Sequence, residues 1–85
     1  MSNNEKPVHE KPVHKIRAGA IEVAVWRREG ENGAFYSVSM NRSYKQGEEW
    51  KQADSFSGDD VIVLSKLLDM AATWMISNPT KQKAA

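Results

Sequence analysis

The fold of this chain depends on one stretch, Lys15-Ile16-Arg17-Ala18-Gly19-Ala20-Ile21-Glu22-Val23-Ala24-Val25-Trp26. Its apolar residues alternate with other residues, a pattern typical of a strand with one buried face. The alternation shifts by one residue at Gly19-Ala20, and a β-bulge explains the shift, because one extra residue exchanges the two faces of a strand. We therefore predict one long, bulged strand. Its buried face carries Ile16, Ala18, Ile21, Val23 and Val25.

Two more strands follow this one. The segment 28–33 ends in Asn32-Gly33, which is a strong hairpin signal. Residues 34–45 then alternate apolar with polar side chains and predict a second strand, whose core face carries Tyr36, Val38 and Met40. After a turn at 46–48, residues 49–56 predict a third strand. There Trp50 and Phe56 share the core face, opposite Lys51 and Ser55.

The last predicted element is a helix from about Asp59 to Ser77, which ends at Asn78-Pro79. Ser57 is expected to cap it, with Asp60 at capping-box spacing. Apolar residues cover more of this helix than one sheet can bury, and the surplus predicts a homodimer through the helix. The expected dimer contacts are Leu64, Leu67, Leu68, Ala71, Trp74 and Met75. The alternative is a helix buried by its own sheet and the N-terminal arm.

Residues 15–78 thus predict one α+β domain, an antiparallel sheet of three to four strands followed by a C-terminal helix. Residues 1–14 form a flexible arm in this interpretation, because the exact repeat of Glu5-Lys6-Pro7-Val8-His9 places two prolines there. Residues 79–85 predict a disordered tail. A metal site at His9 and His14 is the alternative use of the repeat, but no acidic or thiol side chains are positioned beside them.

The composition argues against an enzyme. The 85 residues suffice for one domain, and they include no cysteine, so thiolate metal sites and disulfides are excluded. Both histidines lie in the repeat, which leaves no base beside a nucleophile, and no glycine-rich phosphate loop is present. We expect no catalytic residue, cofactor, metal or small-molecule substrate. Without an apolar leader or an apolar run of about 18 residues, we expect a cytoplasmic protein with no membrane partner.

The sheet face away from the helix is predicted to be polar and basic. It is expected to carry Arg17, Trp26, Ser37, Ser39, Asn41, Ser43, Lys51 and Ser55, with Arg27, Arg28, Arg42, Tyr44 and Lys45 at strand ends or edges. Cations meet phosphates, hydroxyls donate hydrogen bonds and aromatic rings stack on bases, so this face suits a single strand of nucleic acid. The net charge of +1 does not by itself indicate a nucleic-acid binder.

Several segments carry a resemblance to a known family. They are Lys15-Ile16-Arg17-Ala18-Gly19, Ala20-Ile21-Glu22-Val23-Ala24-Val25-Trp26, Phe35-Tyr36-Ser37-Val38, Arg42-Ser43-Tyr44-Lys45 and Glu49-Trp50-Lys51, followed by a leucine-rich helix. From Lys15 to Trp74 the chain resembles the positive-cofactor-four-like proteins, which belong with the Whirly-type single-stranded-DNA binders, and in particular their short bacterial and phage members.

The resemblance implies a homodimer packed through the C-terminal helix, with strongly curved sheets that form a cleft for single-stranded DNA. It also implies a function in transcription, as coactivators serve, or in replication and recombination. By position, the expected DNA contacts are Arg17, Trp26, Arg42, Tyr44, Lys45, Trp50 and Lys51. RNA stays open as a ligand.

Two other functions stay open. A sheet-type reader of duplex DNA would lay the strands into the major groove and would be a monomer, which the surplus apolar helix surface disfavours. A homodimeric protein-interaction module would leave the polar sheet face merely solvated. A double-stranded-RNA domain is excluded, because it requires a helix before its strands. Salt-dependent binding to oligonucleotides separates the nucleic-acid binders from the interaction module.

Overall fold

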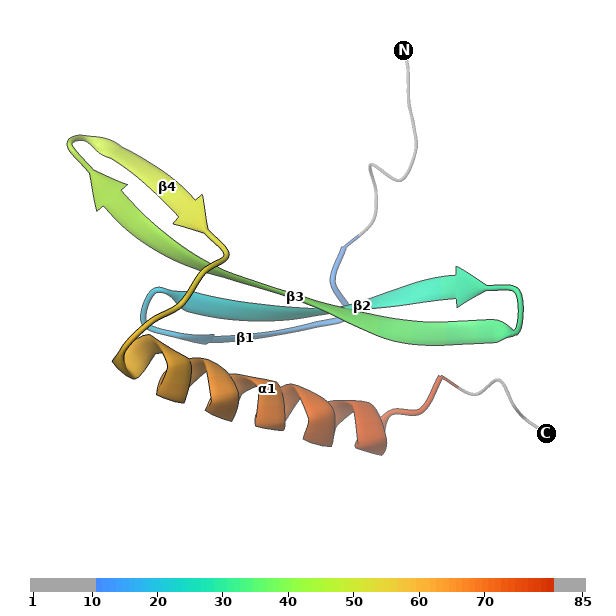
Figure 1. Ribbon diagram of the computed structural model, residues 1–85. Helices are drawn as coiled ribbons and strands as arrows, with labels where there is room; N and C mark the ends of the chain where they lie inside the picture. Colours follow the sequence, from blue (N-terminus) through green and yellow to red (C-terminus); the bar gives the residue numbers. More distant parts are fainter. Residues whose placement is uncertain (1–10, 81–85) are drawn as a thin grey trace, which may run out of the picture.

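The structure is a computed structural model that describes residues 11–80. It confirms the predicted α+β class, with four antiparallel strands in the order β1-β2-β3-β4 followed by one helix (Figure 1). The elements are β1 (His14–Ala18), β2 (Ile21–Gly30), β3 (Gly33–Gln46), β4 (Glu49–Ala53) and α1 (Asp59–Ser77). The helix has the predicted bounds, whereas the third predicted strand ends three residues early.

The predicted β-bulge is wrong, because residues 15–26 form two strands and not one. Ala18 pairs with Ile21, so β1 and β2 are joined by the two-residue turn Gly19-Ala20. Gly19 has φ 61°, a left-handed conformation that glycine adopts at little cost. A bulge and a two-residue turn both shift the alternation by one residue. The predicted faces are nevertheless correct, since paired residues such as Ile16 and Val23 lie on the same face.

The core lies between β2 and one side of α1. Its buried residues are Ile21, Val23, Val25, Leu67 and Ala71. Tyr36, Val38 and Met40 of β3 pack at its margin, as predicted, and Phe56 does so from the loop before α1. The helix lies across β1 and β2, which leaves the β2–β3 and β3–β4 hairpins to project beyond it at opposite ends (Figure 1).

The start of α1 differs from the predicted capping box. The N-cap is Gly58, with φ 62°, and no side chain caps the helix. The backbone N–H of Asp60 donates instead to the backbone oxygen of Ser57 at 3.1 Å. Asp59 and Asp60 still lie in the first turn, where negative charge suits the helix dipole.

Two of the predicted dimer contacts belong to the core of the protomer. Leu67 and Ala71 are 3% and 1% exposed, which leaves them no surface to offer a second copy. Trp74 packs edge-on against Tyr36, with ring centroids 5.4 Å apart. The remaining contacts are half-buried on the flank of α1 that faces away from β1. They are Leu64, Leu68 and Met75.

The ends of the domain extend slightly beyond the predicted 15–78. His14 opens β1, and the N–H of Val13 donates to the oxygen of Val25 at 2.8 Å. Thr80, predicted in the disordered tail, is half-buried and donates through Oγ1 to the oxygen of Ala34 at 3.2 Å. Residues 1–10 of the predicted arm, including His9, and residues 81–85 of the predicted tail lie outside the described residues. No helix within residues 11–80 is long and apolar enough to cross a membrane.

Candidate nucleic-acid interface

The register of the sheet decides which face each predicted contact occupies. Side chains directly opposite each other in antiparallel strands lie on the same face. We call the face that α1 covers the inner face, defined by Ile21, Val23 and Val25, and the opposite one the outer face. Through the strand pairs, the outer face collects the basic and aromatic residues Lys15, Arg17, Trp26, Arg28, Phe35, Lys45 and Trp50. It also carries a row of small polar residues, Ser37, Ser39, Asn41 and Ser43.

The seven predicted DNA contacts divide between the two faces. Arg17, Trp26, Lys45 and Trp50 lie together on the outer face. Arg42, Tyr44 and Lys51 lie in the register of the inner face, because Arg42 is opposite Ile21 and Tyr44 is opposite Lys51. Arg42 turns toward the helix start, where its Nε lies 3.6 Å from the Asp60 carboxylate.

The phase predicted for the third strand is wrong. Gln46 pairs with Glu49, so a two-residue turn at Gly47-Glu48 places Trp50 opposite Lys45 on the outer face. Trp50 is 69% exposed and is therefore not a core residue. The same turn moves Lys51 to the other face.

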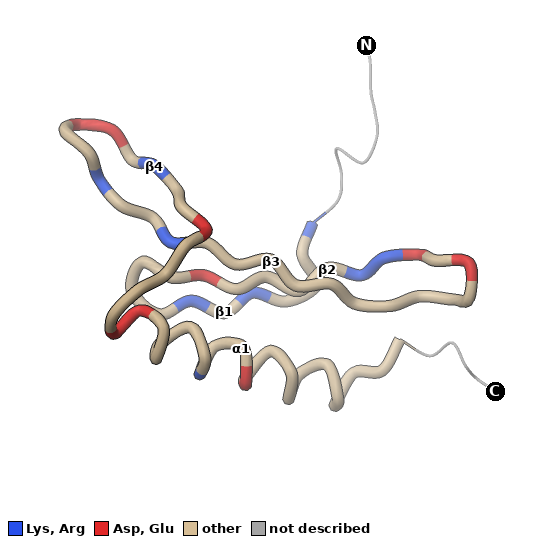
Figure 2. Tube along the Cα trace, viewed as in Figure 1, with Lys and Arg blue, Asp and Glu red and all other residues tan. Residues whose placement is uncertain are grey.

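Charge is distributed unevenly between the faces. The outer face has four cations, Lys15, Arg17, Arg28 and Lys45, against one carboxylate, Glu22. The other carboxylates among residues 11–80 lie at hairpin turns, near strand ends or on α1 (Figure 2). A nearly neutral chain therefore presents one basic sheet face, which is where phosphates would be attracted.

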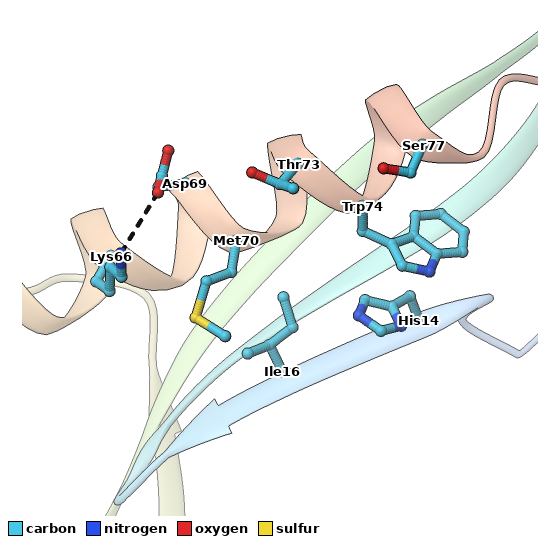
Figure 3. Close-up of a pocket in the computed structure, with 8 residues that line it drawn as sticks. All are labelled: His14, Ile16, Lys66, Asp69, Met70, Thr73, Trp74 and Ser77. Carbon is cyan, nitrogen blue, oxygen red and sulfur yellow. Dashed lines mark ion pairs between the residues drawn. The ribbon is translucent and has the colours of Figure 1, made fainter.

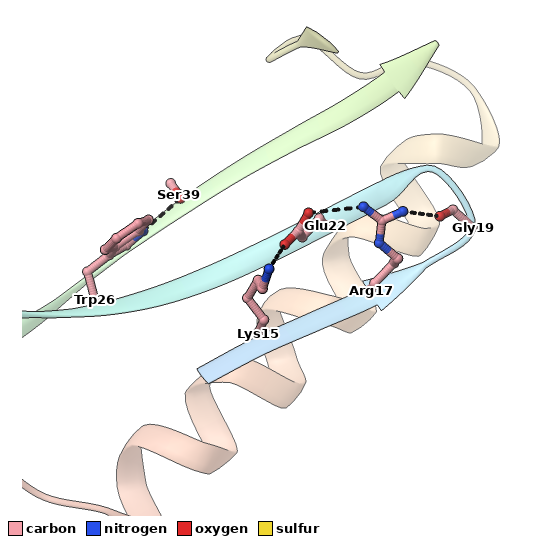
Figure 4. A network of polar contacts seen from close by, with 6 residues as sticks. All are labelled: Lys15, Arg17, Gly19, Glu22, Trp26 and Ser39. Carbon is pink, nitrogen blue, oxygen red and sulfur yellow. Dashed lines mark hydrogen bonds and ion pairs between the residues drawn. The ribbon is translucent and has the colours of Figure 1, made fainter. Parts of the chain in front are cut away.

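Glu22 lies between two of these cations (Figure 4). Its carboxylate is 3.3 Å from Lys15 Nζ and 3.1 Å from Arg17 Nη2. Burial alone would raise the pKa of Glu22, but the hydrogen bonds and charges of Lys15 and Arg17 outweigh it and lower the pKa below the ordinary 4.5. Glu22 is only 16% exposed, whereas Lys15 and Arg17 are 58% and 56% exposed. Both cations thus remain accessible to a ligand.

We expect this cluster to make stability depend on pH. Because the folded-state pKa of Glu22 is lowered, its contribution is fully present above about pH 4.5 and is lost as pH falls through the folded value. Glu22→Gln should therefore lower the free energy of unfolding by about 1 kcal/mol at pH 7, and by less at pH 3. Urea titrations at both pH values measure this difference. Asp69→Asn, in an exposed ion pair on α1, is the control; an equal effect there would contradict the assignment.

Two tryptophans on the outer face are available to stack on bases. Trp26 Nε1 donates to Ser39 Oγ at 2.9 Å, and the Arg28 guanidinium lies 5.3 Å from the Trp26 ring centroid. Trp50 has Lys45 Nζ 5.9 Å from its ring centroid. From Ser37, opposite Trp26, to Lys45, opposite Trp50, β3 spans about 26 Å at ~3.3 Å per residue. Each ring thus has a cation beside it, at opposite ends of the polar row.

The surface between the two rings is polar and partly hollow. A hollow of about 430 Å³ is lined by Arg17, Ser43, Trp50, Lys51 and Gln52. Farther along the row, Asn41 Oδ1 is the one buried side-chain oxygen or nitrogen in the described part of the chain without a hydrogen-bond partner. Exposed ring, cation, hydroxyl and amide therefore come together at the Trp50 end.

Sequence reasoning did not select Lys15 and Arg28 as contacts. Lys15 is two residues from Arg17 and Arg28 is two from Trp26, so strand alternation places them on the same face. The sequence places Arg28 at a strand end, at the start of the turn 28–33, but β2 continues to Gly30. For residues 11–80, no group of three His, Cys, Asp or Glu side chains could hold a metal ion.

Comparison of the chain with protein-family models, with curated proteins and with solved structures found no match.

Proposed function

We propose that this protein binds single-stranded DNA on the outer face of its sheet, as a homodimer paired through α1. The observation that carries the proposal is the gathering of four cations and two tryptophans on one face that has a single carboxylate. Cations neutralise phosphates, and stacking on aromatic rings tolerates any base. Binding would accordingly depend on salt and only weakly on sequence, as transcription, replication and recombination require of such proteins.

Each outer-face residue has a role in this proposal. The exposed cations Lys15, Arg17 and Lys45, together with Arg28, contact phosphates. Trp26 and Trp50 stack on bases at the two ends of the polar row, and Ser43 and Gln52 lie beside Trp50 to donate hydrogen bonds. Arg42, Tyr44 and Lys51, on the other side of the β3–β4 hairpin, are left out of the central contact set.

The homodimer is supported by the apolar flank of α1 that faces away from β1. Leu64, Leu68 and Met75 are only half-buried there, and Val61 is 49% exposed. Because α1 packs mainly on β1 and β2, this flank stands beside the less covered inner surface of β3. Exposed apolar surface of this kind favours a second copy related by two-fold symmetry.

The test is a fluorescence-anisotropy titration of a labelled thymidine oligomer at two salt concentrations, with duplex DNA as competitor. The proposal is supported by tight, salt-sensitive binding for which duplex DNA competes poorly. An RNA oligomer of the same length tests whether the protein prefers DNA to RNA. Efficient displacement by duplex would instead support a duplex reader. Absence of binding at low salt, with a dimer in sedimentation, would favour the interaction module, which the exposed Val61 also suits.

Trp50→Ala should weaken binding of the thymidine oligomer by about tenfold or more, since stacking on an aromatic ring contributes about 1–3 kcal/mol per base. Trp50→Phe should retain most of the affinity. Because Trp50 is 69% exposed, Trp50→Ala should change the free energy of unfolding by less than about 0.5 kcal/mol. Equal affinities of wild type and Trp50→Ala in the same titration would remove this ring from the site.

A further inference from the structure

The side of α1 next to β1 forms a groove separate from the outer face (Figure 3). Two hollows of about 480 and 460 Å³ lie there, and they share Ile16, Lys66 and Met70, so they form one continuous groove between β1 and α1. His14 and Trp74 close one end with rings stacked 4.8 Å apart. Ile62, near the other end, is 67% exposed, and Met70 is 43% exposed.

The wall of this groove is also a free sheet edge. Among residues 11–80, β1 pairs with β2 alone. In a two-residue hairpin, the two residues that flank the turn form a hydrogen-bonded pair, and every second residue along the strand from there does the same. The backbone groups of Ala18 and Ile16 therefore bond to β2. The backbone N–H and C=O groups of Lys15 and Arg17 therefore point away from the sheet. Such groups are a template for another extended chain.

The side chains of β1 specify what kind of chain fits. Ile16 and Ala18 face the groove, whereas Lys15 and Arg17 lie on the outer face and are more than half exposed. In an added strand, alternate side chains would point into the groove, whose lining is mainly apolar at the Ile62 end, and those between them would lie beside the two cations. Apolar residues fit the first positions and carboxylates the second.

The same pattern disfavours a second copy of β1. In an antiparallel β1–β1 pair, Lys15 and Arg17 of one chain would lie beside the same cations of the other. Like charges opposite each other in a sheet are destabilising. The edge therefore selects an acidic chain, and the homodimer proposed above uses the other flank of α1.

We propose that β1 and the groove beside it bind an extended peptide segment of alternating apolar and acidic residues, by strand addition. The backbone bonds of Lys15 and Arg17 hold the segment, its apolar side chains pack against Ile16, Ile62 and Met70, and its carboxylates pair with the two cations. This partner site does not depend on DNA binding. It shares Lys15 and Arg17 with the outer face, however, so an acidic segment bound there would compete with DNA.

The probe is a labelled, end-blocked heptapeptide, Val-Glu-Val-Asp-Val-Glu-Val, titrated by fluorescence anisotropy with the full chain. Saturable binding is expected, and Ile62→Gln with Met70→Gln should weaken it by about tenfold, since apolar burial is lost. Ile76→Gln is the matched control, an 80% exposed isoleucine on α1 outside the groove, and should bind like wild type. Circular dichroism checks that all variants fold.

Two altered peptides test the mode of binding. Two peptides are N-methylated at alternate residues, each along a different edge of the extended peptide. Only the one methylated on the edge that faces β1 should lose binding, because it lacks the N–H donors to β1. Replacing the acids by lysine should also abolish binding. Absence of saturable binding up to about 1 mM peptide would overturn the proposal, as would equal binding of both N-methylated peptides. A loss of self-association in the groove double variant would likewise overturn it, in favour of a second copy. The thymidine titration of that variant, expected to be unchanged, reports on DNA binding separately.

Discussion

Replacing Arg17, Arg28 and Lys45 together by alanine is expected to weaken binding to a thymidine oligomer at least about 100-fold at low salt. Each charge-assisted contact contributes about 1.5 kcal/mol or more, and 1.4 kcal/mol is tenfold in affinity. The slope of log K against log salt should also become shallower by about 2, because each phosphate neutralised on a single strand contributes about 0.7. Anisotropy titrations at several salt concentrations measure both quantities.

The matched control removes the same number of positive charges elsewhere. Arg27 and Arg42 lie in the register of the inner face and Lys66 lies on α1, so the control is Arg27→Ala with Arg42→Ala and Lys66→Ala. This triple variant should keep most of the affinity and of the salt slope. If both triple variants lose affinity equally, the affinity for DNA depends on the net charge of the protein and not on the outer face.

Leu67→Ala is expected to lower the free energy of unfolding by about 3 kcal/mol, within the range of about 2–5 kcal/mol for truncating a buried leucine. Leu67 is 3% exposed and packs on Ile21, Val23 and Val25 in a core of five buried apolar residues, so a cavity there has few neighbours to fill it. In a domain of this size, that loss is a large part of the total stability.

Urea unfolding followed by circular dichroism measures this loss, at one protein concentration because the proposed dimer would make stability depend on concentration. Ile76→Ala, at an 80% exposed position of the same helix, should change the free energy of unfolding by less than about 0.5 kcal/mol. Similar shifts of the urea midpoint for both variants would show that α1 is not held by the face that Leu67 occupies.

The helix was predictable because its signals are local. An apolar pattern of helical period and the stop at Asn78-Pro79 depend only on neighbouring residues, and α1 has the predicted bounds. The turn at Gly19-Ala20 was not predictable, because a β-bulge and a two-residue turn both shift the alternation of apolar and polar residues by one position. Choosing between them requires knowing what the strand pairs with, which is a non-local property.

The candidate site was only partly predictable for a related reason. The phase of β4 depends on the length of the turn at Gly47-Glu48, so an error of one residue moved Trp50 to the wrong face and Lys51 with it. Arg42 and Tyr44 could have been placed correctly. They are two and four residues beyond Met40 on one uninterrupted strand, and the alternation that puts Met40 in the core register puts them on the same face.

The projection of the β3–β4 hairpin beyond α1 has a consequence for dynamics. None of the five residues of β4 is buried, so little apolar contact opposes local opening of this hairpin, whereas opening β2 exposes the whole core. Amide hydrogens of β4 should then exchange through sub-global fluctuations, well before those of β2. A strand of DNA bound to Trp26 and Trp50 would join the slowest-exchanging part of the sheet to the fastest, so its dissociation would begin at the hairpin.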